Sequence, residues 1–372
     1  MSDPRPPIPH IVLMDGTLAT LGGPRSSHIA TIRRLVRKAG PVRVHYARGV
    51  HWDSWGGVRA VITGQGIEDR IAEAYGWLAS SWRPGDPIFV FGYSRGAFTA
   101  RSLAGMIGRV GLLQPRQATQ RNIRLAWRLY QRETTGAVLA GFMRRCHDHV
   151  PIDMLGVFDT VAALGLRLPV MWMLTEGRHR FHDHHLGGHV RFGAQALALD
   201  ETRAVFQPIL WDRAEAARLE QRWFRGCHPD IGGQLNGREV SRPLANIPLV
   251  WMLGLAEARG LPLPAGWRGL FPCDATAPSV GSWTGWGRAF LLRAPRTVGT
   301  AGDSLHDSVP LPYRGPALMA GASRRGFARG IRGRRGGGAP PVPNPPDQAA
   351  CSAAATPSAA QTSAVSSGRF SV

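Results

Sequence analysis

A serine placed between two glycines is the feature of this sequence best suited to chemistry. Residues 92–96 (GYSRG) follow the apolar run 87–90 and precede a helix-like stretch at 97–110. This G-x-S-x-G pattern is typical of a nucleophile elbow, a sharp strand-to-helix turn at which small neighbours let the serine oxygen project from the sheet. Ser94 is therefore the predicted nucleophile of an acyl-transfer reaction. The alternative is a glycine-rich turn with no chemical role.

A serine hydroxyl needs a base, and Asp159 and His228 are the predicted partners of Ser94. Asp159 ends the apolar run 151–158, and His228 follows the strand-like run 221–226. An imidazole can take the serine proton, and a carboxylate fixes the imidazole tautomer and stabilises the imidazolium. The chain order serine, aspartate, histidine is that of the α/β-hydrolases.

Other residues compete for the acid and base positions. Asp153, Asp183 and Asp230 are alternatives to Asp159. We expect Asp230 to brace the turn predicted at 229–233, because aspartate side chains readily bond nearby backbone. The alternative for His228 is a surface histidine with no part in the chemistry.

An oxyanion hole requires two N–H donors near the serine. One is predicted to be the backbone N–H of Arg95, which follows the nucleophile, while the Arg95 side chain pairs locally. The second is predicted in the loop at Gly16 and Thr17, after the first strand, because glycine permits a close backbone approach.

Strands alternating with helices must position these residues. Apolar runs predict strands at 11–14, 42–46, 87–90, 151–158 and 221–226, and amphipathic stretches predict helices at 27–39, 67–82 and 97–110. This order indicates an α/β fold with a mostly parallel sheet covered by helices on both faces. Functional residues of such sheets gather beyond the carboxyl ends of the strands, where Asp15, Ser94, Asp159 and His228 all lie.

Residues beyond the serine motif carry a more specific resemblance. The run 92–101 (GYSRGAFTAR) resembles the G-[FY]-S-R-G-A-x-x-A-R signature of the type VI secretion phospholipase effectors, whose wider relatives form an α/β-hydrolase domain family. Further segments agree in order, namely 15–17 (DGT), 156–161 (GVFDTV), 196–201 (ALALDE), 223–233 (WFRGCHPDIGG) and 305–309 (LHDSV). The resemblance covers roughly residues 9–315.

This resemblance implies an α/β-hydrolase fold and hydrolysis of a carboxylic ester, which in the characterised effectors is a phospholipid acyl ester. It assigns Ser94, Asp159 and His228 as nucleophile, acid and base. The chain departs from the family in having Gln195 where a histidine is usual before Ala-Leu-Ala. It also lacks the aromatic residue and asparagine often found after Thr17, and the extra membrane-associated region of some effectors.

Composition sets further bounds on the molecule. The chain has 372 residues, 44% of them hydrophobic, and a net charge of +20 carried almost entirely by arginine. This basic charge favours contact with anionic surfaces, whether phospholipid or nucleic acid, and nucleic acid is the less expected partner of the two. No apolar run reaches the length of a membrane span, and the first residues lack the layout of a signal peptide. We expect synthesis in the cytoplasm, with export by a type VI secretion system implied by the resemblance.

Two segments outside the motifs have compositions that suggest separate roles. Residues 166–174 are apolar and follow the Asp159 strand, so they could form either a lid over the site or a core helix. The histidine-rich segment 179–189 has no spacing that closes a metal site, and the four cysteines form no C-x-x-C pair. We therefore expect neither a metal nor a cofactor.

The expected domain organisation is a single hydrolase domain with a tail. Residues 1–318 are predicted to form the α/β-hydrolase domain. Residues 319–372, which are Arg/Gly-rich and then Ala/Pro/Ser-rich, are predicted to form a disordered tail. Expected partners are a phospholipid or other acyl ester and an immunity or secretion protein. The alternatives are a general esterase or thioesterase acting on soluble substrates, and a non-catalytic scaffold that binds membrane or nucleic acid.

Overall fold

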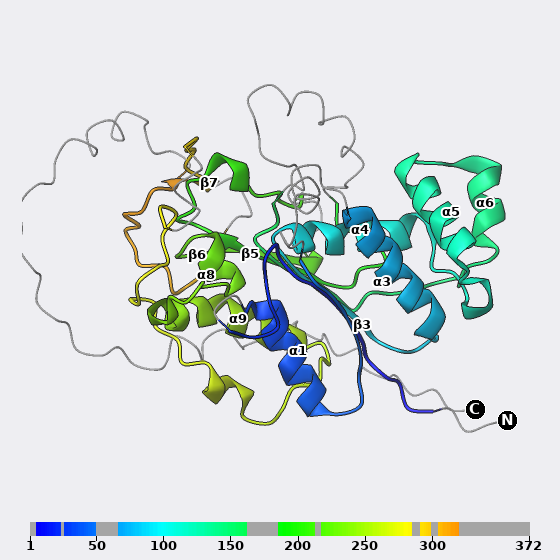
Figure 1. Cartoon of the computed structure of the whole chain (residues 1–372), viewed down its shortest axis with the longest axis horizontal. Helices are drawn as coiled ribbons and strands as arrows, with labels where there is room; N and C mark the ends of the chain where they lie inside the picture. Colours follow the sequence, from blue (N-terminus) through cyan, green and yellow to red (C-terminus); the bar gives the residue numbers. More distant parts are fainter. Residues whose placement is uncertain are drawn as a thin grey trace, which may run out of the picture.

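The apolar runs of the sequence form a seven-stranded parallel sheet in the computed structural model (Figure 1). The structure describes residues 5–23, 26–49, 66–161, 185–212, 217–284, 291–298 and 304–319. The strand order is β2-β1-β3-β4-β5-β6-β8, and each neighbouring pair is parallel. The strands are β1 (His10–Met14), β2 (Arg43–Ala47), β3 (Ile88–Tyr93), β4 (Met154–Phe158), β5 (Gly193–Ala198), β6 (Leu219–Phe224) and β8 (Ser304–Leu305).

Helices cover both faces of this sheet, because a connection between parallel strands has to cross back over it. The first face is covered by α3 (Ile67–Ser81), α4 (Arg95–Val110) and α5 (Gln120–Gln131), with α6 (Gly136–Met143) beside them. The second face is covered by α1 (His28–Ala39) and α9 (Arg242–Glu257), as Figure 1 shows. A five-residue helix, α8 (His228–Gly232), follows β6.

Strand β1 shows how the sequence supplies both layers of the core. Val12 and Met14 pack in the cluster under α3 and α4, whereas Ile11 and Leu13 pack in the cluster under α1 and α9. Successive side chains of a strand point to opposite faces, so a strand covered on both sides must be apolar throughout.

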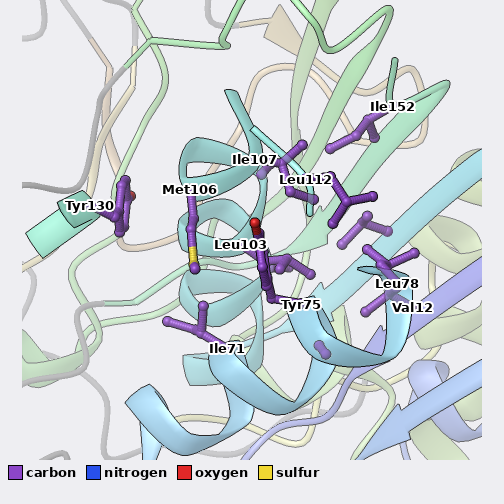
Figure 2. Packing of buried hydrophobic residues seen from close by; sticks show 14 of the residues in the cluster. Val12, Ile71, Tyr75, Leu78, Leu103, Met106, Ile107, Leu112, Tyr130 and Ile152 are labelled. Carbon is purple, nitrogen blue, oxygen red and sulfur yellow. The ribbon is translucent and has the colours of Figure 1, made fainter. Parts of the chain in front are cut away.

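The packing of α3 against α4 fixes the helix that begins at the serine motif. Tyr75 and Leu78 of α3 lie among Leu103 and Ile107 of α4, all of them buried (Figure 2). The Tyr75 hydroxyl donates to the carbonyl of Gly111 at 2.8 Å, which ties α3 to the end of α4. The apolar repeat at three and four residues, which predicted both helices, is the repeat that faces the core.

The structure differs from the sequence-based expectation at two elements near the site. Residues 229–233, predicted as a turn, belong mostly to helix α8, and Gly233 ends this helix with a left-handed φ of 74°. Strand β5 was not among the strands that periodicity predicted. Its sequence, GAQALA, has no β-branched or aromatic residue, so it gives almost no local strand signal.

The C-terminal part of the domain adds a small second sheet. Strands β7 (Thr297–Val298) and β9 (Leu318–Met319) pair in parallel, and β9 lies at the predicted domain boundary. The lid candidate 166–174 and the tail beyond 319 lie outside the described residues. Within the described ranges, no helix has both the length and the apolar character needed to cross a membrane.

Candidate active site

Ser94 stands at a strained turn between β3 and α4. Its backbone has φ 58° and ψ −124°, in a region that residues with a side chain rarely adopt. The Ser94 N–H donates to the Phe158 carbonyl at 3.0 Å, which extends the β3–β4 pairing up to the turn. The strain is maintained by the sheet on one side and by α4 on the other.

The two glycines of the motif are required by close backbone contacts. A Cβ atom on Gly92 would lie 2.5 Å from the Cα of Ala97, and one on Gly96 would lie 2.2 Å from the carbonyl oxygen of Met14. Both contacts are with backbone, which cannot move aside as a flexible side chain can. The motif therefore packs β3, α4 and the end of β1 closely enough for the turn to form.

Ser94, His228 and Asp159 come together in the geometry of a catalytic triad. His228 Nε2 lies 2.8 Å from the Ser94 hydroxyl, and His228 Nδ1 lies 2.5 Å from Asp159 Oδ2. All three residues are buried, with exposed fractions of 6%, 5% and 0% for serine, histidine and aspartate. An ionised carboxylate only accepts, so Nδ1 carries the proton and Nε2 is left to accept from the serine hydroxyl.

Asp159 is held by donors on both of its oxygens. Arg296 donates from Nη1 to Oδ1 at 2.6 Å and from Nη2 to Oδ2 at 2.9 Å, and the Ala198 N–H donates to Oδ1 at 3.0 Å. Burial by itself would raise the pKa of Asp159, but the Arg296 charge and the His228 bond outweigh it and hold the pKa well below its usual value. The acid position therefore carries a fixed negative charge.

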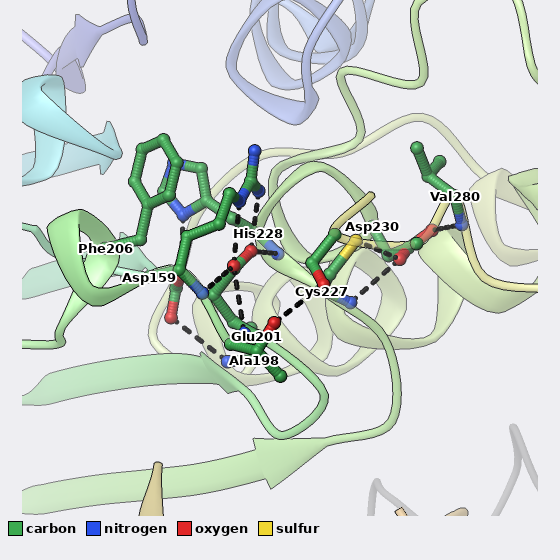
Figure 3. Close-up of polar contacts among 12 residues, drawn as sticks. Asp159, Ala198, Glu201, Phe206, Cys227, His228, Asp230 and Val280 are labelled. Atoms are coloured by element: carbon green, nitrogen blue, oxygen red, sulfur yellow. Dashed lines mark hydrogen bonds and ion pairs between the residues drawn. The ribbon is translucent and has the colours of Figure 1, made fainter. Parts of the chain in front are cut away.

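The His228 ring lies between two aromatic rings. Phe206 stacks on it with 4.7 Å between ring centroids, and Tyr93 lies on it at 5.0 Å. The backbone N–H of His228 donates to Glu201 Oε2 at 3.1 Å. Figure 3 shows Asp159, Glu201 and Phe206 around the histidine. These contacts restrict the imidazole to one orientation.

Asp230 braces the short helix that presents His228, as predicted, and lies apart from the triad. It accepts from the Cys227 N–H at 2.8 Å, from the Ser279 hydroxyl at 2.6 Å and from the Val280 N–H at 3.0 Å (Figure 3). Cys227 is fully buried, and burial together with nearby Asp230 raises the pKa of its thiol well above the usual value. This keeps Cys227 in the thiol form, which is a poor nucleophile.

Glu201 and Arg203 form a buried pair beside the histidine. Arg203 donates from Nε to Glu201 Oε1 at 2.8 Å and from Nη2 to Oε2 at 2.6 Å. Burial would raise the pKa of Glu201, but the bonds and charge of Arg203 lower it overall. Arg203 also lies over the Phe206 ring at 4.2 Å, so the pair supports both the backbone and the ring face of His228.

The predicted oxyanion loop lies at the N-terminus of α4, with one correction. The Gly16 N–H donates to Asp15 Oδ1 at 2.8 Å, so it is already engaged and is not the loop donor. Thr17 remains the candidate donor, and its hydroxyl accepts from Arg95 Nε at 2.6 Å. Arg95 is the first residue of α4, where a backbone N–H has no acceptor inside the helix.

Gly16 has a packing role instead. A Cβ on Gly16 would lie 2.5 Å from Cδ1 of Tyr93, the ring that contacts His228. Asp15 holds the loop, because it also accepts from the Ser27 hydroxyl and the Tyr46 hydroxyl, each at 2.7 Å. The Arg95 side chain pairs locally with Thr17, as expected.

The remaining predicted candidates lie elsewhere. Asp153 accepts from the Ile88 N–H at 2.8 Å, at the start of β3 and so at the opposite end of the strand from Ser94. Asp183 lies outside the described residues. Gln195 is fully buried. Its side-chain oxygen accepts at 2.9 Å from the hydroxyl of Thr160, the residue that follows Asp159.

The histidine-rich segment is described only from residue 185 onward. His185 lies 3.4 Å from an Asp212 carboxylate oxygen, and both side chains are more than half exposed. Within the part of the chain that the structure describes, no group of three His, Cys, Asp or Glu side chains could hold a metal ion.

Arg296, Glu201 and Phe206 support the site but were not predicted to do so. Glu201 lay within a segment that resembled the family, but its contact with the His228 N–H could not be inferred from that. Arg296 is one of many arginines and has no motif around it. It reaches Asp159 across 137 residues of chain.

The fold and the site together define the class of protein. A parallel sheet covered on both faces, a serine on a strained turn after β3, and an aspartate and a histidine hydrogen-bonded in series with it after later strands are the arrangement of an α/β-hydrolase. The chain belongs to the family described as "T6SS, Phospholipase effector Tle1-like, catalytic domain", whose model matches residues 9–254.

Individual relatives cover only parts of this chain. It is 32% identical over 155 residues to the uncharacterized protein YEL023C of Saccharomyces cerevisiae, a match over 38% of this chain and 21% of that protein. An uncharacterized protein from Pseudomonas aeruginosa of known structure is 17% identical, with a TM-score of 0.44, over 73% of this chain and 51% of that one. The Tle1 effector bound to the VgrG spike is 16% identical, with a TM-score of 0.37, over 61% of this chain and 51% of that one.

Proposed function

We propose that this protein is a serine hydrolase that cleaves acyl esters of phospholipids. The observation that carries the proposal is the hydrogen-bonded series Ser94–His228–Asp159, with the serine on a strained turn at the start of α4. Membership of a phospholipase effector family supports the ester as the bond cleaved.

The mechanism follows from the positions of the donors and acceptors. His228 Nε2 takes the Ser94 proton as the serine oxygen attacks the ester carbonyl, and Asp159 stabilises the imidazolium. The N–H groups of Arg95 and Thr17 bind the oxyanion of the tetrahedral intermediate. His228 then protonates the leaving alcohol, and a water molecule activated by His228 releases the fatty acid from Ser94.

Exposed apolar side chains beside the site support a lipid substrate. Trp283, Leu291 and Leu292 are exposed by 55%, 79% and 60%. The Leu292 carbonyl accepts from the Ala204 N–H at 3.1 Å, and Ala204 begins the turn that carries Phe206 onto His228. Exposed apolar residues on and near the segment that meets this turn, on a chain with a net charge of +20, suit the uptake of an acyl chain from an anionic membrane.

Secretion and immunity partners belong to the same proposal. The family is one of type VI effectors, and one solved relative is described as bound to the VgrG spike. We propose that this chain is exported by such a system and is neutralised in the producing cell by an immunity protein.

The substrate class can be tested with matched substrates. The purified protein and its Ser94→Ala variant are assayed on mixed anionic phospholipid vesicles, on a short-chain p-nitrophenyl ester and on an acyl thioester. We expect Ser94-dependent release of fatty acid from the vesicles at the highest kcat/KM. Turnover of only the soluble esters would identify a general esterase or thioesterase, and no Ser94-dependent turnover would favour the non-catalytic scaffold.

A further inference from the structure

We propose that Arg296, in the segment before β7, is a positioning residue that completes the triad by clamping Asp159. This inference rests on the proposed function. Arg296 lies beyond residues 9–254, the part of the chain that the family model matches.

The clamp is a two-pronged contact in a buried setting. Arg296 is 1% exposed, and its two terminal nitrogens donate to the two oxygens of Asp159 at 2.6 and 2.9 Å. A planar guanidinium matches a carboxylate in this way, whereas a lysine ammonium would contact it as a point charge. The carboxylate cannot rotate without breaking both bonds.

The guanidinium also links the acid to the base. Its Nη1 donates to the Ala198 carbonyl at 2.8 Å, and its Nη2 donates to the carbonyl of Phe206, whose ring stacks on His228. A single side chain therefore connects the end of β5, the acid and the ring that covers the base. Asp159 needs this support because its own backbone has a φ of 45°.

Arg296 is itself held by the small second sheet. The Leu318 N–H donates to the Arg296 carbonyl at 2.8 Å, and the residue that follows, Thr297, begins β7. The Ala294 N–H donates to the Thr202 carbonyl at 2.8 Å, which attaches the same segment to the loop after β5. Backbone bonds on both sides thus set the direction from which the guanidinium reaches Asp159.

The clamp also settles the charge of the site. Three groups face Asp159. They are His228 of α8, Arg296 of the segment before β7, and the Tyr93 hydroxyl of β3. Glu201 and Arg203 lie beside this group and pair with each other. The Arg296 charge lowers the pKa of Asp159, so its removal would raise the pKa of this buried carboxyl.

The test uses the full-length protein with Arg296→Met, Arg296→Ala and Arg296→Lys. The matched control is Arg222→Met, since Arg222 of β6 also reaches the C-terminal part of the chain, through Ser304 Oγ at 2.7 Å, without touching the triad. Measurements are kcat and KM on vesicles across pH 5 to 9, the rate of fluorophosphonate labelling, and near-UV circular dichroism to establish folding.

We expect Arg296→Met to lower kcat by about 10²-fold with little change in KM, because the change misplaces the acid and so acts on the chemical step rather than on substrate binding. The acid limb of its kcat/KM profile should move to higher pH. Arg296→Lys should recover only part of the loss. Guanidinium ion at millimolar concentration should restore labelling of Arg296→Ala, which leaves a space of that shape, and should not affect Arg222→Met.

A folded Arg296→Met protein whose kcat is within about twofold of the wild-type value, and whose acid limb lies at the same pH, would overturn the inference. If the Met and Lys variants do not fold and guanidinium restores nothing to Arg296→Ala, Arg296 serves folding alone and the inference is again wrong. Labelling of the wild type at Ser94 separates these outcomes from failure of the proposed function. A protein that is not a serine hydrolase would show no labelling in any variant, and a hydrolase of soluble esters alone would be labelled but would release no fatty acid from the vesicles.

Discussion

At the scale of single residues, the site is marked by two strained positions. Ser94 and Asp159 are two of the few non-glycine residues in the described chain with a positive φ, at 58° and 45°. Each such position costs about 1–3 kcal/mol, so both must be maintained by their surroundings. For Ser94 these are the β3–α4 contact at Gly92 and the contact between α4 and β1 at Gly96, and for Asp159 they are the Arg296 and Ala198 bonds.

Replacing Asp159 with asparagine should distinguish the effect of its charge from the effect of its shape. Asp159→Asn keeps the size of the side chain, but its amide cannot hold the Nδ1–H tautomer of His228, so kcat should fall by about 10³–10⁴-fold. The change also leaves Arg296 buried without its counter-ion and should destabilise the fold by about 3–5 kcal/mol. Vesicle hydrolysis and urea unfolding measure the two effects. A kcat within tenfold of wild type would remove Asp159 from the acid position.

Buried histidines should make the fold sensitive to acid. His28 is fully buried, donates to the Ala245 carbonyl at 2.9 Å, and has a pKa lowered by burial to about 3. The unfolded chain therefore binds a proton below pH 6.5 that the folded chain does not, and stability falls as the pH drops from there. Between pH 6.5 and 5 this amounts to about 2 kcal/mol.

Urea unfolding at these two pH values tests the histidine effect. His28→Gln can still donate a hydrogen bond and has no titrating ring. It should be less stable than the wild type at pH 6.5, but its free energy of unfolding should change less between pH 6.5 and 5 than that of the wild type. An equal difference in both proteins would show that His28 does not titrate as described.

At the scale of elements, the serine motif joins three of them. The glycine at 96 lets the start of α4 approach the end of β1, where the Met14 carbonyl would be 2.2 Å from an added Cβ. The short helix α8 is attached on two sides, through Glu201 after β5 and through the loop at Ser279 and Val280. His228, the proposed base, is therefore presented by a helix of only five residues that depends on its neighbours for its position.

Gly96→Ala should disrupt the elbow. The added methyl must displace backbone, so we expect a loss of about 3 kcal/mol in the free energy of unfolding and little remaining activity. Gly269→Ala is the matched control, since an added Cβ there meets nothing within 4 Å, and it should change stability by less than about 1 kcal/mol. Equal stability of the two variants would contradict the close packing described.

Asp230→Ala should loosen α8 without removing any of the three side chains of the triad. It leaves the buried N–H groups of Cys227 and Val280 without their acceptor, at about 1–3 kcal/mol each, and kcat should fall about tenfold as His228 shifts. Asp274→Ala, in the same loop region, is the control, because the Asp274 carboxylate accepts from its near neighbours Thr276 and Ala277. Unchanged kcat in a folded Asp230→Ala protein would show that the brace does not position the base.

Periodicity and motif predicted much of this arrangement, and its failures have physical reasons. The apolar repeats of β1, β3, α3 and α4 are local, so the sequence predicted these elements directly. Ser94, Asp159 and His228 could be proposed because parallel strands end at one edge, although their contact distances could not. Arg296 contacts Asp159, and Phe206 contacts His228, from segments that are distant in the chain from these partners. No local sequence pattern predicts such contacts. Strand β5 was missed because its small residues give no strand signal.

At the scale of the whole molecule, charge and exposed apolar groups act together. The chain carries a net charge of +20, and large apolar side chains at 283, 291 and 292 lie exposed on the segments beside the site. Arginines are interspersed with them: Arg293 lies over the Trp283 ring at 3.6 Å. Such a surface suits reversible binding to an anionic membrane, with the apolar groups entering the interface.

Leu291→Asp should weaken that binding selectively. A leucine buried in lipid contributes about 1.5–3 kcal/mol, so vesicle hydrolysis should fall at least about tenfold while turnover of a short soluble ester is retained. Leu270→Asp, at an exposed leucine in the loop after α9, is the control. Added salt should weaken vesicle binding of the wild type. Equal losses on vesicles and soluble ester would contradict a role in membrane binding.

The central claim, that Ser94 is a nucleophile activated by His228, is tested most directly by covalent labelling. The wild type, Ser94→Ala and His228→Ala are treated with a fluorophosphonate, and the modified residue is identified by peptide mass spectrometry. We expect a single adduct on Ser94 in the wild type, none in Ser94→Ala, and labelling slowed by about 10³-fold or more in His228→Ala. An adduct on another residue, or equal labelling rates in the wild type and His228→Ala, would contradict the account.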